Sequence, residues 1–267
     1  MDVALSRLDD IRGLRASLAG VDAVFHLAGA ERLGARGDLL QTDVVGTRTV
    51  AEAAVEAGVQ RLVFLSHLGA SRSSAYPMLK AKAIAEEHIR RSGVPFLILR
   101  SAFAYGMEDH FTTSLAMLLA AFPAVVPIPG DGSTLLQPLW VEELALCLAW
   151  GLEEEFTLGR TYEIGGPEYL SLTQVLEMVM VETGMRRLLM PTRPPYLRAM
   201  IWLMEHALRF SPVTVLWLDY LAVNRTCELG TLPRVFGLQP SRMERNLGYL
   251  RRHKWLAELV RRQFATR

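Results

Sequence analysis

Three short apolar runs decide the fold: DAVFHLAGA (residues 22–30), RLVFLSHLGA (61–70) and PFLILRSAFAYG (95–106). Runs of this length and composition are typical of parallel strands that are buried on both faces. Two amphipathic stretches separate them, residues 39–59 and 78–94, and each closes near a glycine that suits the end of a helix. Strands that alternate with helices in this way predict a parallel α/β sheet with right-handed crossovers.

The alternation becomes irregular after residue 106, and the segments that follow carry mostly helical patterns. We therefore expect a parallel-sheet domain over residues 1–106 and a smaller, mainly helical lobe over residues 107–267 packed on it. The most apolar stretch, YLRAMIWLMEHALRFSPVTVLWLDYL (196–221), is interrupted too often by charged residues and by Pro212 to span a membrane. Two core helices are the favoured prediction for it, and a surface helix that contacts a membrane is the alternative.

The composition excludes several classes of protein. Across 267 residues the chain is 51% hydrophobic and 21% charged, with a formal net charge of +1 and only short basic runs, which argues against a nucleic-acid partner. Cys147 and Cys227 lack metal-ligand or C-x-x-C spacing, so we expect a reduced protein without a metal site. The N-terminus has acidic residues and no long apolar run, unlike a signal or transit peptide, so we expect a cytoplasmic location.

Five motifs in a fixed order resemble those of the short-chain dehydrogenase/reductase superfamily, in its extended and atypical branches. In chain order they are DAVFHLAGA (22–30), TDVVGTRTVAEAA (42–54), RLVFLSHLGA (61–70), ILRSAFAYG (98–106) and LQPLWVEELA (136–145). The second and the last are helix motifs, and the other three are strand motifs. The first helix motif has Asp43 where the superfamily usually has Asn. Within the superfamily, the chain looks most similar to the atypical NAD(P)-binding group that includes the accessory NAD(P)H-binding subunit of respiratory complex I.

The resemblance implies a Rossmann-like sheet that binds NAD or NADP and a small-molecule substrate that the sequence does not identify. The residues that it places near the cofactor are His26, Ala28, Gly29, Ser66, Lys82 and Arg100. Each polar one also has a simpler interpretation: a hydrogen-bonded strand residue for His26, a turn hydroxyl for Ser66 and a paired charge for Arg100. The oligomeric state is not predicted.

The catalytic Tyr and Lys of the superfamily lie on one helix, in the pattern YxxSKAxxE. Lys82 fits this pattern, because Ala83 follows it and Glu86 lies four residues later, and the Tyr position is then occupied by Met78. In this register the chain keeps the Lys that contacts a nicotinamide ribose and lacks the phenol that would transfer a proton. The alternative register uses Tyr76 and Lys80, which are also one helical turn apart.

The resemblance is incomplete at the N-terminus. Dinucleotide-binding folds of this kind begin with a strand and a glycine-rich turn that holds the pyrophosphate. The sequence contains no such turn, and residues 1–24 resemble the segment that normally follows the third strand, with Asp2 near the expected adenine site. We therefore expect two βα units, about 60 residues, to be missing ahead of Met1. Weak or absent NAD(P) binding by this chain is the expected result.

Three functional hypotheses remain. The first is an NAD(P)-binding protein of the atypical type, epimerase- or reductase-like and associated with quinone or a respiratory complex. The second is a non-catalytic structural or assembly subunit that retains the fold. The third is an active reductase or epimerase that uses Tyr76 and Lys80. The resemblance places Ser66 where the superfamily has the catalytic Ser that touches the substrate. Retention of Lys82 favours the first, and the missing glycine-rich turn favours the second over the third.

Overall fold

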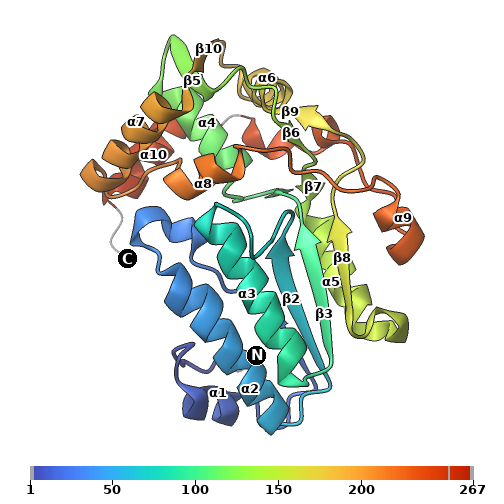
Figure 1. Cartoon of the computed structure of the whole chain (residues 1–267). Coiled ribbons are helices and arrows are strands. Elements are labelled where there is room, and N and C mark those ends of the chain that lie inside the picture. Colours follow the sequence, from blue (N-terminus) through green and yellow to red (C-terminus); the bar gives the residue numbers. More distant parts are fainter. Residues whose placement is uncertain (1–2, 252, 265–267) are drawn as a thin grey trace. The chain divides into compact units, whose positions relative to one another are not determined.

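The computed structural model describes residues 3–251 and 253–264, which form two compact units (Figure 1). Asp2, expected near an adenine, lies outside the described residues. The first unit contains the chain up to Ser101 together with Ala145–Ile164, and the second contains Ala102–Leu144 and the chain from Gly165 onward. Residues 145–164, which the sequence pattern places in the C-terminal lobe, thus group with the N-terminal sheet.

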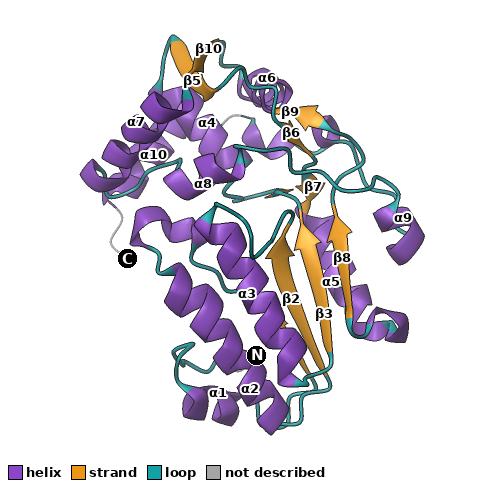
Figure 2. Ribbon diagram, viewed as in Figure 1, coloured by secondary structure: helices purple, strands orange, loops and turns teal. Residues whose placement is uncertain are grey.

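The N-terminal unit is built on a four-stranded, fully parallel sheet of order β1-β2-β3-β8 (Figure 2). The strands are β1 (Ala23–His26), β2 (Arg61–His67), β3 (Phe96–Ser101) and β8 (Arg160–Ile164). Side chains on both faces of β2 and β3 are buried, as expected of a parallel sheet. The predicted parallel α/β fold is therefore confirmed.

Helical segments of the N-terminal unit precede β1, connect β1 to β2 and β2 to β3, and precede β8 (Figure 1). They are α1 (Ile11–Ser17), the 3-10 segment η1 (Glu31–Arg36), the π-helical segment η2 (Leu40–Gly46), α2 (Thr47–Glu56), α3 (Pro77–Ser92) and the 3-10 turn η3 (Glu155–Thr157). Pro77 opens α3, where its missing N–H is not needed, and Gly93 closes it with a φ of 87°. Val50 of α2 and Ile89 of α3 pack against Phe64 of β2 in one apolar core.

Within the described residues, β1 forms a ladder only with β2, so its other edge is open. Phe25 of β1 is also 43% exposed, whereas Val63, its partner in β2, is fully buried. Unpaired strand edges usually recruit another strand or are protected from doing so.

The C-terminal unit is mainly helical, as predicted, but it is the larger of the two units and not the smaller, because the segments on both sides of residues 145–164 belong to it. Its helices are α4 (Thr112–Ala121), α6 (Leu172–Thr183), α7 (Pro194–Ala207), α8 (Val215–Tyr220), α9 (Thr231–Phe236), α10 (Trp255–Phe264) and two 3-10 turns, η4 (Met243–Arg245) and η5 (Gly248–Leu250). The helix α5 (Val141–Glu153) begins in this unit and ends in the other. Three two-stranded ladders join the segments between helices: β4 (Ala104–Tyr105) with β7 (Leu139–Trp140), β5 (Val125–Pro129) with β10 (Leu188–Thr192), and β6 (Leu135–Leu136) with β9 (Leu170–Ser171).

A continuous apolar core holds the C-terminal unit together. The strongly hydrophobic helix α4 is buried on almost all sides, with Leu115 and Leu119 in contact with the inner faces of the other helices. No helix among the described residues is long and apolar enough to cross a bilayer.

Candidate functional site

The N-terminal unit contains a buried ion-pair cluster centred on Lys82. This side chain lies on the inner face of α3 and is only 2% exposed. Its Nζ lies 2.8 Å from Oδ1 of Asp43, in the π-helical segment η2, and 3.6 Å from Oε2 of Glu31. The other carboxylate oxygen of Asp43 accepts a hydrogen bond of 3.0 Å from the backbone N–H of Ala30. A buried ammonium needs such partners, because removing a charge from water is costly unless the charge is paired.

The loop after β1 closes over this cluster. Glu31, at the start of η1, contacts Lys82 with one oxygen, and its other oxygen lies 3.3 Å from Nε2 of His67 at the end of β2. Burial acts to raise the pKa of Glu31, but the hydrogen bond from His67 and the charge of Lys82 outweigh it, so the pKa is lowered. Gly29 permits this closure, because a Cβ there would lie 2.1 Å from the Glu31 carboxylate.

His26 ends β1 beside the same cluster. Its Nε2 lies 2.8 Å from the hydroxyl of Thr47 at the start of α2, and its ring stacks on Phe64 with the ring centroids 5.4 Å apart. Burial, and then the charge of Lys82, lower the pKa of His26 to about 4. The imidazole is therefore neutral near pH 7, so it can exchange a hydrogen bond but adds no charge.

A second buried network joins the strand ends to α3. Glu86 is fully buried and accepts a hydrogen bond of 2.7 Å from the Ser66 hydroxyl and two of 2.9 Å from the guanidinium of Arg100. Arg90, one turn later on α3, donates a further bond of 2.8 Å. Burial alone would raise the pKa of Glu86, but the hydrogen bonds from Arg100, Ser66 and Arg90 lower it. The Ser66 hydroxyl thus donates its proton within the protein.

Residues 2–113 match a family model described as NAD(P)H-binding. The mitochondrial NADH dehydrogenase (ubiquinone) 1 alpha subcomplex subunit 9 of Arabidopsis thaliana is 33% identical over 46% of this chain and 30% of its own length. The Mus musculus subunit of the same name is 26% identical over 94% of this chain and 68% of its own length. The chain therefore spans less than a third of the Arabidopsis relative that it matches.

The solved structures agree. The NADPH-dependent quinone oxidoreductase QOR2 of Escherichia coli, in complex with NADPH, superimposes with a TM-score of 0.74 at 18% identity, covering 94% of this chain and 83% of that one. The family model and the relatives together confirm the predicted superfamily, the atypical short-chain dehydrogenase/reductases. They agree with the main functional prediction, an NAD(P)-binding protein of this type. At this identity, the structural likeness shows the fold alone.

The structure also places both candidate registers of the superfamily motif on α3. Met78 is buried one turn before Lys82, so a thioether occupies the position of the superfamily phenol. Tyr76 precedes the helix as its N-cap residue and is partly exposed, and Lys80 is exposed on the outer face. Of the two lysines, Lys82 is the one that the fold brings to His26 and Asp43. The catalytic roles expected for Ser66, Tyr76 and Lys82 stay predictions.

Four residues of the cluster were not predicted as site residues, namely Asp43, Glu31, Thr47 and His67. Thr47 lies in the GTRTV part of the helix motif, so its position was available from the sequence. Glu31 lies in the loop AERLGARG, which matches no motif, and only the fold brings it to Lys82. The remaining expected residues, Ala28 and Gly29, are partly buried in the loop after β1.

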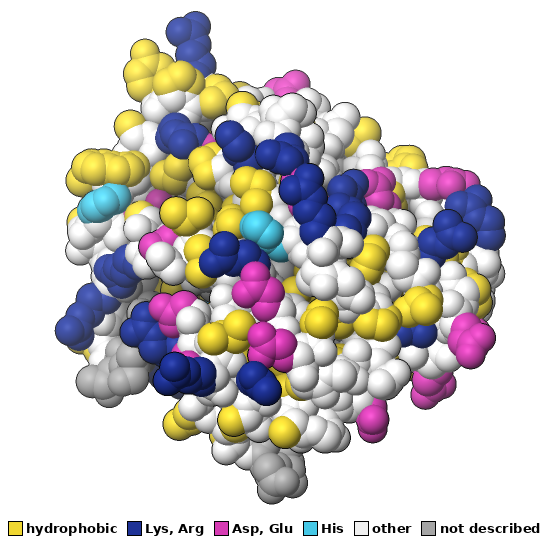
Figure 3. Space-filling view, turned by 60° about the horizontal axis from the view of Figure 1, so that its bottom comes forward, with side chains coloured by type: hydrophobic (Ala, Val, Ile, Leu, Met, Phe, Trp, Pro, Cys, Tyr) yellow, Lys and Arg dark blue, Asp and Glu magenta, His cyan; other side chains and the backbone are white. Residues whose placement is uncertain are grey.

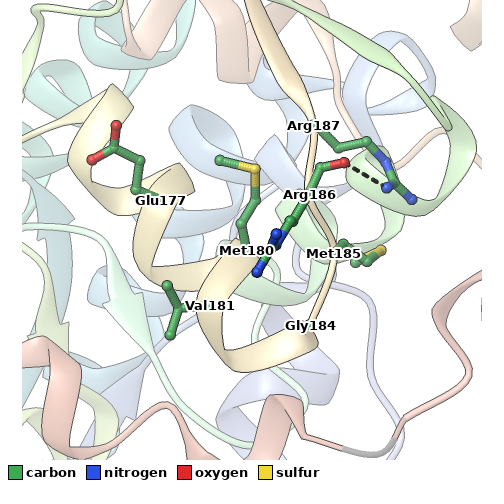
Figure 4. Close-up of a pocket in the computed structure, with 7 residues that line it drawn as sticks. All are labelled: Glu177, Met180, Val181, Gly184, Met185, Arg186 and Arg187. Carbon is green, nitrogen blue, oxygen red and sulfur yellow. Dashed lines mark hydrogen bonds between the residues drawn. The ribbon is translucent and has the colours of Figure 1, made fainter.

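Pockets occur in both units. In the N-terminal unit, an open polar pocket of about 360 Å³ lies against the Glu86 network and is lined by Arg72, Arg90 and Arg100 among others. In the C-terminal unit, a surface pocket of about 520 Å³ lies between the end of α6 and residues 184–187 (Figure 4). Within the described residues, no group of His, Cys, Asp and Glu side chains could hold a metal ion.

Proposed function

We propose that this chain holds the nicotinamide-ribose end of NAD or NADP at the carboxyl ends of β1 and β2. The observation that carries the proposal is the buried Lys82 ammonium at 2.8 Å from Asp43. An ammonium has three N–H donors, and its contacts with Asp43 and Glu31 are ion pairs that do not have hydrogen-bond geometry, so a donor is available for a ribose hydroxyl. Ligands of open parallel sheets bind at the carboxyl ends of the strands, where Gly29 and Ser66 also lie.

The residues fit one end of the cofactor and not the other. The cation, the neutral imidazole of His26 and the backbone at Gly29 suit a ribose and a carboxamide. The phosphate end needs a glycine-rich turn at a helix N-terminus, and the sequence contains none. The cofactor, when bound, would supply a hydride acceptor or donor. We expect weak binding by this chain alone, and we propose that a further strand completes the sheet at the open edge of β1.

Catalytic turnover has less support than cofactor binding. With Met78 at the position of the phenol, no hydroxyl of α3 lies one turn before Lys82 to donate a proton. This favours a binding or assembly role, and the relatives whose names describe subunits of NADH dehydrogenase agree with it. The alternative, a reductase or epimerase that uses Tyr76 and Lys80, places its lysine on the exposed side of the helix. Association with quinone or a respiratory complex, and the cytoplasmic location, stay proposals.

Calorimetric titration with NADH and with NADPH tests the proposal. We expect micromolar or weaker affinity for the unaltered chain. The double variant Lys82→Met/Asp43→Asn, which removes both charges and so avoids an unpaired buried one, should weaken binding about tenfold or more. The matched control is Lys80→Met on the outer face of the same helix, which should bind within about twofold of the unaltered chain.

Two results of these titrations would contradict the proposal. If the folded chain gives no heat with either cofactor, the nucleotide-binding proposal fails for this chain. If Lys80→Met abolishes binding and the double variant does not, the register based on Tyr76 and Lys80 replaces the one proposed.

A further inference from the structure

The outer face of α7 is apolar although it is exposed. Leu197 and Ile201 point into the core of the C-terminal unit and are buried. On the other side of the helix, Tyr196, Trp202 and Leu203 are 69%, 54% and 61% exposed. Clusters of large exposed apolar side chains usually mark a surface that something else covers.

A second helix with the same character lies beside the end of α7. On α10, Leu256, Val260 and Phe264 follow one another at a spacing of four residues, and all three are exposed. The backbone N–H of Phe210, just after α7, donates a hydrogen bond of 3.2 Å to the side chain of Gln263 on α10. The side-chain amide of Gln263 donates one of 2.5 Å back to the Phe210 carbonyl.

The charges around α7 have one sign. From Gly184 to Cys227 the sequence contains two acidic residues, Glu205 and Asp219, and both are buried. Four arginines of the same stretch are exposed: Arg186, Arg193, Arg198 and Arg209. One of them, Arg198, pairs with Asp219 and is still half exposed. The exposed charge of this surface is therefore positive.

Surfaces next to α7 along the chain also carry exposed apolar and basic side chains. Leu188 and Met190 of β10, which leads into α7, are exposed. The pocket at the end of α6 presents Met180 and Arg186, with Glu177 as its one acidic residue (Figure 4). The face drawn in Figure 3 carries hydrophobic, basic and acidic side chains mixed together.

We propose that the outer faces of α7 and α10, with the arginines around α7, dock on the surface of a bilayer that contains anionic lipid. Apolar and aromatic side chains enter the boundary between headgroups and acyl chains, and the arginines contact the phosphates. Tyr and Trp favour this interface because their rings are apolar and their polar atoms stay near water. A protein partner would need a complementary acidic groove, whereas a bilayer accommodates apolar residues that are spread over two helices.

Sedimentation with lipid vesicles tests the proposal, with the full chain and two vesicle compositions. We expect binding to phosphatidylcholine vesicles that contain about 30% phosphatidylglycerol, at least about fivefold weaker binding to phosphatidylcholine alone, and loss of most binding in about 0.5 M NaCl. The variant Trp202→Ala/Leu203→Ala should reduce the partition coefficient about tenfold or more. Arg193→Gln should reduce it about fivefold, because one arginine near an anionic surface contributes about 1 kcal/mol.

The matched control is Phe156→Ala/Leu158→Ala, which removes two exposed apolar side chains from the N-terminal unit. This control should bind vesicles as the unaltered chain does. All four apolar positions are exposed, so we expect both double variants to keep the fold, and circular dichroism of each variant checks this. Binding that is equal for both double variants, or that is absent with anionic vesicles, overturns the proposal. If the chain does not bind vesicles, and analytical ultracentrifugation shows a dimer that Trp202→Ala/Leu203→Ala dissociates, the surface is a protein interface instead.

Discussion

In the N-terminal unit the charged side chains of Lys82, Asp43 and Glu86 are buried, whereas in the C-terminal unit the apolar side chains of Tyr196 and Trp202 are exposed. Both arrangements depart from the usual distribution of residues, in which charges are seldom buried and large apolar clusters are seldom exposed. The first departure is resolved within the chain, because each of these three charges has a partner of opposite sign. The exposed apolar side chains of the second are not covered by the described residues of the C-terminal unit. A buried network therefore indicates a site that the chain builds itself, and an exposed apolar face indicates a missing neighbour.

The strongest test of this contrast is the removal of one partner from the buried pair. Lys82→Met leaves the Asp43 carboxylate buried without its cation, and we expect the free energy of unfolding to fall by about 3 to 5 kcal/mol. The double variant Lys82→Met/Asp43→Asn should recover most of this loss, because both charges are gone. Urea denaturation of the single and double variants measures the effect.

Lys80→Met on the outer face of α3 is the control for this prediction, and it should change the free energy of unfolding by less than about 0.5 kcal/mol. If Lys82→Met costs no more than this control, the pair does not stabilise the N-terminal unit.

The second prediction concerns acid. Because the pKa of His26 is lowered from 6.5 to about 4, the unfolded chain takes up a proton at this residue before the folded chain does. The contribution of His26 to stability is present above pH 6.5, is lost progressively as the pH falls from 6.5 to about 4, and amounts to about 3 kcal/mol at most. Replacing His26 by Asn should remove this acid-sensitive part.

Thermal unfolding of both proteins at pH 7 and at pH 5 measures that difference. The lowered pKa of Glu31 acts only below its ordinary value of 4.5, so it does not obscure the comparison. An unchanged difference between the two pH values in His26→Asn would show that other groups carry the acid sensitivity.

The smallest expected effect concerns the exposed face of α7. Trp202→Ala and Leu203→Ala should each change the free energy of unfolding by less than about 0.5 kcal/mol, because the folded chain does not bury these side chains fully. Ile201→Ala, one residue earlier but in the core, should cost about 2 to 5 kcal/mol. Urea denaturation distinguishes them. A large loss for Trp202→Ala would mean that the outer face stabilises the chain itself and is not reserved for a partner.

Much of the fold of the N-terminal unit could be predicted, because it depends on local patterns. The apolar runs at residues 61–70 and 95–106 contain β2 and β3, and the helix predicted over residues 78–94 is α3, Pro77–Ser92. The pairing of β8 with β3 could not be predicted, since it joins Arg160 to Leu97 across a long stretch of chain that has no motif for it. This pairing also explains why residues 145–164 group with the N-terminal unit.

The candidate site could be predicted in part for a similar reason. Lys82 was found from its local spacing to Glu86, which is a property of one helix. Its contacts with Asp43 and Glu31 depend on the packing of three segments, so no spacing in the sequence reports them. For the stretch 196–221 a surface helix was only the alternative prediction, because residues 196–208 are apolar on both sides of the helix and the pattern does not say which side is covered.

The π-helical segment η2 has a consequence for how this site can be inherited. A π turn holds one residue more than an α turn, and η2 continues without a break into α2. Deleting Val44 or Val45 would therefore let this segment contract to an α turn, and Asp43 would keep its direction from the helix. Deleting a residue within α2, which has no extra residue to give up, would instead turn the preceding residues by about 100° around the helix axis and separate Asp43 from Lys82. The buried ion pair is therefore expected to survive the loss of one codon in η2 and not the loss of one codon in α2.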